Sequence, residues 1–373
     1  MRSRTQFILV LSSIAALIIL PASLVWAIDP LQVYRARANH PVDLQRLSRY
    51  QIAGLIRSYL ADPDKEFDTI IIGTSLSQNF APSQVKETLG SSGVLKMAMA
   101  GAHVPTQLLV AKRALQEPTL KRVIWELNDR SFALMPADKV NANHVFPAYL
   151  YQGGMALRKY LLNIDNVEEC LRQLGIMTGS DEWRPQGDEW GSWYYSDEHW
   201  KKKQKKHKRN HFGAYRKALK QKVLLAFTTP EQLLQQHPPS ARYSGIDQVA
   251  SLVAQHPNVQ FDFFIPPVSA AFYACKDPAE LSIRFGMTRY AVKQLSHLPN
   301  ARLFAFNDVE AIVCNLSLYR DIAHYHPDIN RWILEAIEHN KHRLDSSNID
   351  AYEQAWYYLI RAVRVTDLDR DER

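Results

Sequence analysis

The sequence predicts an α/β fold built on a parallel sheet of about five strands. Three short apolar runs, at residues 67–73, 93–99 and 121–127, each end at a turn rich in glycine or asparagine. Stretches with helical spacing separate them, as parallel strands require. Two more apolar runs, at residues 259–265 and 301–306, follow later with another helical stretch between them. This rhythm of strand, turn and helix indicates βαβ topology.

The first apolar run contains the clearest strand signal and a candidate nucleophile. Ile70 to Ile72 are consecutive isoleucines, which is typical of a strand buried on both faces. The run breaks at Gly73, and Pro82 suits the first turn of the next helix. Ser75 lies between them, so we expect its hydroxyl at the carboxyl edge of the sheet, where open α/β folds hold their chemistry. An ordinary capping serine is the alternative.

Apolar spacing predicts further helices at residues 105–115, 246–254, 278–298, 331–342 and 349–365. No buried-strand pattern occurs at residues 133–238, which are rich in aromatic residues. We interpret this segment as a mainly helical or irregular insertion that caps the carboxyl edge of the sheet. Its aromatic residues suit the stacking of sugar rings, or form a small core of the cap. Residues 29–66 read as a membrane-proximal helical lead-in, residues 67–366 as the α/β domain and residues 367–373 as a charged tail.

The N-terminus predicts a membrane anchor over residues 1–28. Arg2 and Arg4 precede 22 residues without a charge, from Phe7 to Ile28. About 20 apolar residues suffice to cross a bilayer. The arginines favour a cytoplasmic N-terminus, which sends the rest of the chain to the extracytoplasmic side. A cleaved signal ending near residues 25–27 is the alternative.

Charge and cysteine content narrow the class of protein. Among 373 residues the net charge is +7, and the run at residues 201–209 alone holds seven positive charges. The near-neutral remainder argues against a nucleic-acid-binding protein. We expect the basic run to be a mobile, solvated loop, with attraction of an anionic polymer or lipid headgroups as the alternative. Three cysteines without a C-x-x-C spacing indicate neither a metal site nor a redox pair, and we expect all three to be buried small hydrophobes.

Four polar signals fall at or beyond the ends of predicted strands. They are Gly73-Thr74-Ser75, Gly101, Glu126-Leu127-Asn128-Asp129, and Asp321-Ile322-Ala323-His324. Their order resembles the blocks of the SGNH (GDSL-type) hydrolase superfamily, over about residues 67–127 and 248–342. Two positions differ from that pattern, since Thr74 replaces an aspartate and Glu126 replaces a glycine. The resemblance is closest to membrane-anchored extracytoplasmic members, such as the D-alanine transfer protein of teichoic acid synthesis and polysaccharide O-acetylation proteins.

The resemblance implies a flavodoxin-like three-layer α/β/α domain and a serine-based site. Ser75 would be the nucleophile, His324 its base and Asp321 the acid that orients the histidine. The oxyanion hole would consist of the Ser75 and Gly101 backbone N–H groups and the Asn128 side-chain amide. His326 is a competing base and Asp308 a competing acid. His103 and His144 are weaker candidates for lining the cleft, and Pro266-Pro267 for shaping its wall.

These features predict an anchored acyl transferase or esterase that acts on a cell-envelope or exported polysaccharide through an acyl-serine intermediate. A membrane O-acyltransferase is a candidate partner. We expect no metal, cofactor or nucleotide, because the sequence holds no metal-ligand cluster and no phosphate-binding Gly-x-x-x-x-Gly-Lys run. The alternatives are a non-catalytic polymer-binding or scaffold component of an export complex and a secreted lipase-type esterase.

Overall fold

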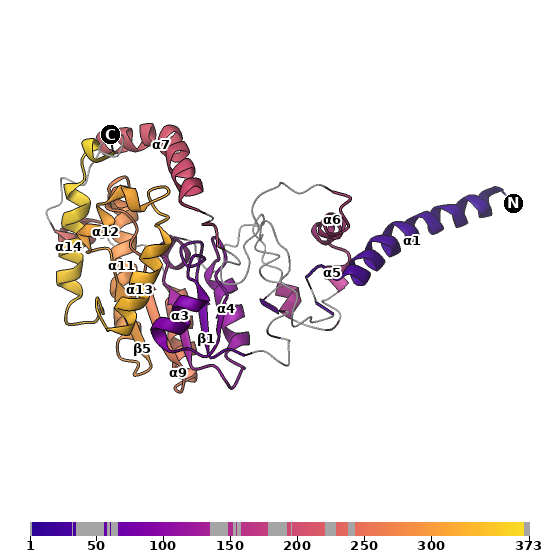
Figure 1. Cartoon of the computed structure of the whole chain (residues 1–373), viewed down its shortest axis with the longest axis horizontal. Helices are drawn as coiled ribbons and strands as arrows, with labels where there is room; N and C mark the ends of the chain where they lie inside the picture. The colour runs from indigo at the N-terminus through magenta and orange to yellow at the C-terminus, as the bar shows by residue number, and fades with distance from the viewer. Residues whose placement is uncertain are drawn as a thin grey trace. The chain divides into compact units, whose positions relative to one another are not determined.

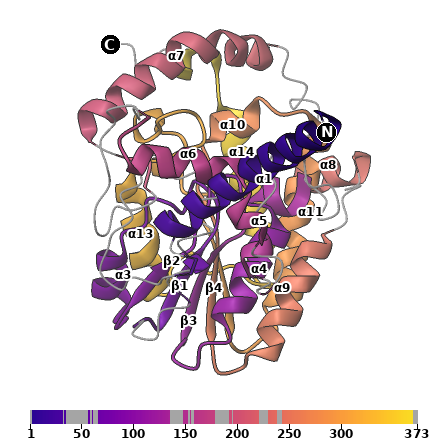
Figure 2. The ribbon, with the colours of Figure 1, turned by 90° about the vertical axis from the view of Figure 1, so that its right-hand side faces the viewer.

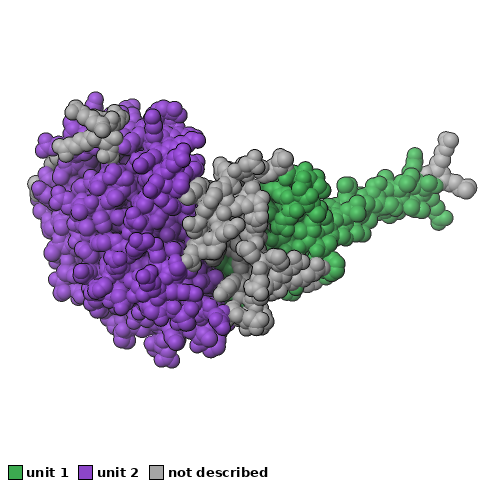
Figure 3. Space-filling model, viewed as in Figure 1, with its two compact units in different colours: residues 1–65, 145–187 green, residues 66–144, 188–373 purple. Residues whose placement is uncertain are grey.

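The computed structural model describes residues 2–31, 33–34, 56–57, 60, 66–134, 148–151, 154, 158–177, 192–194, 196–220, 229–237 and 243–368. The chain forms two compact units, which Figure 3 colours separately. Unit 1 comprises Met1–Lys65 and Val145–Gly187, and unit 2 comprises Glu66–His144 and Asp188–Arg373. The predicted insertion is thus divided between the units, whereas the predicted lead-in lies largely outside the described residues.

Unit 2 contains a five-stranded, all-parallel sheet, which confirms the predicted fold class. The strand order is β2-β1-β3-β4-β5, the order of flavodoxin-like folds. The strands are β1 (Thr69–Ile72), β2 (Val94–Lys96), β3 (Arg122–Glu126), β4 (Gln260–Ile265) and β5 (Ala301–Ala305). Each lies within one of the five apolar runs of the sequence. The order reverses between β1 and β3, so the turn after β1 lies at the switch point where such sheets bind ligands.

Most side chains of the central strands are apolar and buried, because helices cover both faces of the sheet. Ile70, Ile71 and Ile72 of β1 have no exposed surface, and Ile71 pairs with Ile124 of β3. On one face lie α3 (Pro82–Leu89) and α13 (Pro327–Glu338), which pack against each other. This double coverage is the usual setting of a parallel sheet.

The opposite face carries α4 (Val104–Ala114), α9 (Ser244–Gln255) and α11 (Pro278–Leu295), packed side by side. Figure 2 shows the strands between these helices and the pair α3 and α13, which gives three layers. Beyond α11, α14 (Ile349–Ala362) packs against α8 (Pro230–Gln236) and α10 (Ala270–Ala274). A short helix, α12 (Glu310–Val313), follows β5, and Figure 1 places it in the same part of unit 2.

The basic run is helical, so the expected loop is wrong. Residues 201–209 lie inside α7 (Asp197–Lys220), a single continuous ribbon in Figure 1. Two acidic residues open the helix, where its dipole favours negative charge. Lysine is also a good helix former. Three apolar side chains are buried and hold the helix on unit 2: Trp200, Phe212 and Leu219.

Unit 1 contains the predicted membrane helix. Helix α1 (Arg2–Ile28) is long and apolar enough over Arg4–Ile28 to span a bilayer. At its end, the Asp29 carboxylate accepts hydrogen bonds from the backbone N–H groups of Val33 (2.8 Å) and Tyr34 (2.9 Å). The hydroxyl of Tyr160 donates to the same carboxylate at 3.0 Å. Unit 1 also holds α5 (Arg158–Leu161) and α6 (Ile164–Gln173), both packed against α1.

The cysteines correct one expectation. Cys170 is buried, Cys275 is half-buried and Cys314 is exposed, and all three are free thiols. Cys170 lies on the face of α6 that meets α1, where its Sγ is 4.0 Å from the carbonyl oxygen of Leu24. Only this cysteine is therefore the buried small hydrophobe that we expected of all three.

Candidate active site

The turn after β1 presents Ser75 at the carboxyl edge of the sheet. After β1 and Gly73 the chain forms a tight turn, in which the Ser77 N–H donates a hydrogen bond to the Thr74 carbonyl oxygen at 3.1 Å. Ser75 is half-buried, whereas its neighbours Thr74 and Leu76 are buried. The turn therefore leaves the serine hydroxyl accessible and encloses the residues on either side.

Ser75, His324 and Asp321 form one continuous hydrogen-bonded chain. Ser75 Oγ lies 2.9 Å from His324 Nε2. On the far side of the imidazole, His324 Nδ1 lies 2.8 Å from Asp321 Oδ2. With Nδ1 carrying the proton, Nε2 is free to accept the proton of Ser75. The order of serine, histidine and carboxylate is that of a nucleophile, its base and the group that orients the base.

The Asp-x-x-His segment is a preorganised turn. The Asp321 Oδ1 atom accepts the backbone N–H groups of Ala323 and His324, each at 2.9 Å. Burial alone would raise the pKa of Asp321, but the hydrogen bonds and charges of His324 and the nearby Arg320 hold it well below its ordinary value. The Asp321 carboxyl is therefore ionised at neutral pH. A carboxyl must be ionised to stabilise an imidazolium.

Two residues tie the histidine loop to the nucleophile turn. The hydroxyl of Tyr325 and the side-chain amide of Asn330 both donate to the carbonyl oxygen of Leu76, at 3.3 and 3.1 Å. Behind the loop, the Tyr319 hydroxyl donates to the Pro267 carbonyl at 2.7 Å. Pro266-Pro267 thus supports the histidine loop from the end of β4.

Thr74 and Glu126, the two positions that differ from the pattern that the sequence resembles, contact each other. Glu126, at the end of β3, is fully buried. Its Oε2 accepts the Thr74 N–H at 2.9 Å and the Ser77 hydroxyl at 2.5 Å, and its Oε1 accepts the Thr74 hydroxyl at 2.6 Å. Burial raises the pKa of Glu126, and hydrogen bonds from Ser77, Thr74 and Asn128 oppose that rise. Thr74 and Glu126 are thus one buried pair beneath the nucleophile turn.

This carboxyl also explains the glycine before the turn. A Cβ atom at Gly73 would lie 2.6 Å from Glu126 Oε2 and 2.3 Å from Ser77 Oγ. Both distances are too short for a methyl group, so only glycine lets the chain pass over the carboxyl.

The expected oxyanion donors lie at the same edge of the sheet. Among the described residues, no group accepts a hydrogen bond from the N–H of Ser75 or of Gly101. Gly101 has a φ of 59°, which favours glycine. Asn128 Oδ1 accepts the Arg130 N–H at 3.0 Å, and the Asn128 amide donates a hydrogen bond to Glu126. No hydrogen bond joins Gly101 or Asn128 to Ser75 or His324 within the described residues.

Trp193 from the predicted insertion contacts the site directly, which sequence analysis missed. Its indole N–H donates to the Ser75 carbonyl oxygen at 2.5 Å. Its ring lies edge-on to His324 with 5.3 Å between centroids, and the Arg320 guanidinium lies 4.1 Å from its centroid. Trp193 also stacks on Trp200 of α7. Trp193, Tyr194 and Trp200 thus pack on one another beside the histidine loop, and the stacking of sugar rings on them stays a prediction.

Helix α7 borders the site. The Gln204 side-chain amide donates to the carbonyl oxygen of Tyr319 at 2.6 Å, next to the histidine loop. The lysines on either side of Gln204 are exposed, as are Lys201 and Lys202. Helix α7 therefore carries exposed positive charge, and its Gln204 contacts the histidine loop.

The competing residues lie elsewhere. His326 caps the N-terminus of α13 and packs against Trp200 and Tyr194. Asp308 makes no hydrogen bond with His324 among the described residues. His103 is the N-cap residue of α4, and His144 lies outside the described residues.

Comparison with known proteins gives no family for this chain. No protein-family model matches it, and no curated protein matches its sequence. Within the described residues, no group of three or more histidine, cysteine, aspartate or glutamate side chains is arranged to hold a metal ion. The site is therefore characterised by its own geometry.

Proposed function

We propose that this protein is a serine acyl hydrolase or O-acyltransferase of SGNH type. The observation that carries the proposal is the chain from Ser75 Oγ to His324 Nε2 at 2.9 Å and from His324 Nδ1 to Asp321 at 2.8 Å. A serine hydroxyl needs such a base to attack a carbonyl near neutral pH. Such an arrangement of groups is suited to acyl transfer.

In the first step, Ser75 Oγ attacks the acyl carbonyl carbon and His324 Nε2 takes the hydroxyl proton. Charge develops on the carbonyl oxygen, and the N–H groups of Ser75 and Gly101 and the Asn128 amide would stabilise it. His324 then gives its proton to the departing alcohol as the tetrahedral intermediate collapses. The products of this half-reaction are a free alcohol and acyl–Ser75.

In the second step, a hydroxyl attacks the acyl carbonyl and His324 Nε2 takes its proton. Collapse returns that proton to Ser75 Oγ and releases the acyl product. Water as the attacking group gives hydrolysis, and a sugar hydroxyl gives transfer. Trp193 contacts both Ser75 and His324, so we assign it a part in shaping the entry of that second group.

We infer the location from α1, which spans the membrane in this proposal with Arg2 and Arg4 on the cytoplasmic side. Unit 2 then lies on the extracytoplasmic side, where the acceptor would be a cell-envelope or exported polysaccharide. The exposed lysines of α7 favour a polymer that carries negative charge. Because an acyl donor must reach that compartment, a membrane O-acyltransferase is the proposed source. The alternative is a non-catalytic scaffold. A Ser75–His324 distance too long for a hydrogen bond would favour it.

The test uses labelling by a serine-directed fluorophosphonate and turnover of an aryl acetate. We expect the full-length protein to show both, and Ser75→Ala to show neither while it unfolds at an unchanged temperature. The matched control is Ser251→Ala, on an exposed position of α9. Labelling of the Ser75→Ala variant at the wild-type level would overturn the proposal.

Transfer and hydrolysis are separated by product analysis. An acidic oligosaccharide is added with the aryl acetate, and mass spectrometry detects acetylated sugar. Acetylated sugar from the wild type, absent with Ser75→Ala, identifies a transferase. Acetate alone identifies an esterase.

A further inference from the structure

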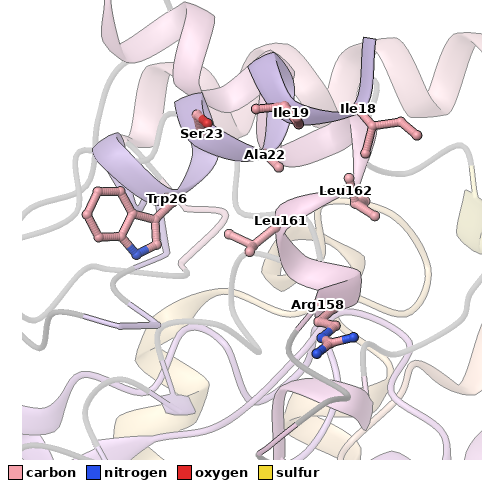
Figure 4. A pocket seen from close by; sticks show the side chains of 8 residues that line it. All are labelled: Ile18, Ile19, Ala22, Ser23, Trp26, Arg158, Leu161 and Leu162. Carbon is pink, nitrogen blue, oxygen red and sulfur yellow. The ribbon is translucent and has the colours of Figure 1, made fainter. Parts of the chain in front are cut away.

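A groove in unit 1 lies between α1 and α5. It has a volume of about 440 Å³ and is lined by eight residues: Ile18, Ile19, Ala22, Ser23, Trp26, Arg158, Leu161 and Leu162. Figure 4 shows the α1 side chains facing Leu161 and Leu162, with Arg158 at one end. The lining is thus apolar apart from one hydroxyl and one guanidinium. No residue that the structure describes forms an ion pair with Arg158.

The groove lies at a definite depth along α1. The uncharged stretch begins at Phe7, and about 20 residues at 1.5 Å each cover a hydrocarbon core of about 30 Å. With α1 as a membrane span, this core ends near Trp26, a residue type suited to the interface. The groove between Ile18 and Trp26 therefore opens among the outer parts of the acyl chains, just below the headgroups.

The segment that contains α5 and α6 also exposes apolar side chains. Five large hydrophobic residues of the α5–α6 segment are 40–68% exposed: Leu162, Ile164, Leu174, Ile176 and Met177. Five large apolar side chains exposed within 16 residues of sequence are unusual for a water-facing surface. The position of this segment beside a membrane helix is what a segment lying in the bilayer interface requires.

We propose that the groove binds a phospholipid, with an acyl chain against Leu161 and Leu162 and the phosphate on Arg158. Arg158 lies three residues before Leu161 on the same face of α5, so the guanidinium and the leucine side chains line the groove together. Guanidinium and phosphate form strong bidentate hydrogen bonds. The α5–α6 segment then lies in the interface as a second membrane contact beside the span.

The volume favours a lipid chain over a partner helix. A helix is about 10 Å across, so 440 Å³ would accommodate only about one turn of it. A single acyl chain is much thinner and can fill the groove along its length. A second copy of this chain packed against the groove is the competing occupant, which cross-linking through α5 would reveal.

The first experiment is photolabelling of the full-length protein in phosphatidylcholine vesicles that contain a phosphatidylcholine with a diazirine in its acyl chain. We expect adducts on residues 158–162 as well as on the exposed face of α1. Leu161→Glu should reduce the α5 adducts several-fold and leave those at Phe7 to Leu17 unchanged. Absence of α5 adducts in the wild type, or protein–protein cross-links through α5 in their place, would overturn the proposal.

The second experiment tests the phosphate contact. Arg158→Gln should retain phosphatidylcholine about five- to tenfold more weakly in native mass spectra of the detergent-solubilised protein. The matched control is Arg172→Gln on α6, because Arg172 is already paired with Glu168 and Glu169. Circular dichroism checks that both variants are folded. Equal retention by the two variants would refute the assigned role of Arg158. Neither experiment depends on Ser75 chemistry.

Discussion

Replacement of Glu126 tests whether the buried pair beneath the nucleophile turn holds Ser75 in place. Besides the Asn128 amide, Glu126→Ala leaves three donors of the nucleophile turn without an acceptor: the Thr74 N–H, the Thr74 hydroxyl and the Ser77 hydroxyl. Each buried donor left unpaired costs about 1–3 kcal/mol. We therefore expect a loss of at least about 3 kcal/mol and a fall in Tm of at least about 6 °C. Because Thr74 directly precedes Ser75, kcat for an aryl acetate should also fall.

Glu126→Gln should behave differently, because it imitates the protonated acid. Its oxygen can accept the Thr74 N–H and the Ser77 hydroxyl, and its N–H₂ group can donate to Thr74 Oγ1. Burial raises the pKa of Glu126 above its ordinary 4.5, so the folded state binds its proton more tightly than the unfolded state does. Wild-type stability should therefore fall, relative to Glu126→Gln, as the pH rises above about 4.5, by up to about 1.4 kcal/mol per pH unit.

The assay is thermal unfolding of the full-length protein in detergent micelles from pH 4.5 to 8, with turnover measured in parallel. Glu353→Gln is the control for turnover, since this buried carboxyl lies on α14 and pairs with Arg289. It should leave kcat unchanged. A Glu126→Gln variant as unstable as Glu126→Ala, or a difference from wild type that is constant with pH, would refute the reasoning.

Three further predictions concern single side chains. Asp321→Asn should lower kcat by about 10⁴-fold, since the imidazole loses its orienting carboxylate. The pKa of Asp321 lies below its ordinary 3.8, so the ionised carboxylate stabilises the folded state. As the pH falls below about 3.8, the wild type should lose this stabilisation and Asp321→Asn should not. Thermal unfolding between pH 5 and 3 measures the difference. Trp193→Phe removes one hydrogen bond to Ser75, worth about 1 kcal/mol, and should lower kcat/KM about fivefold; unchanged kinetics would count against its role. Arg284→Leu leaves two carboxylates without their buried partner and should cost about 3–5 kcal/mol in denaturant unfolding, with a loss under 1 kcal/mol contradicting this.

The sheet could be predicted from the sequence because its strands are buried on both faces. Each strand is then mostly apolar, and Ile70 to Ile72 are the clearest case, although Asp262 interrupts β4 and Arg302 interrupts β5. The positions of Ser75 and His324 were also predictable, since each belongs to a short block at the end of a strand or beyond it. Their 2.9 Å contact spans 249 residues of sequence and required the structure.

The missed features are contacts between residues that carry no periodic signal. Thr74 and Glu126 are 52 residues apart and read separately as two departures from a pattern, although together they form one hydrogen-bonded pair. Trp193 reaches Ser75 from 118 residues away. The helical state of residues 201–209 was signalled by Asp197, Glu198 and the apolar residues of α7, but the charge run obscured that pattern.

The order of the strands has a consequence for biosynthesis. β3 ends at Glu126, and its partner β4 begins only at Gln260, after the chain has passed through the second segment of unit 1. A ribosome that adds about 5–20 residues per second needs roughly 7–27 s for this interval. During that time the open edge of β3 has no strand to pair with, which is a known route to aggregation. The nascent half-sheet therefore needs protection at the β3 edge, by a chaperone or by its own intervening chain, until β4 emerges.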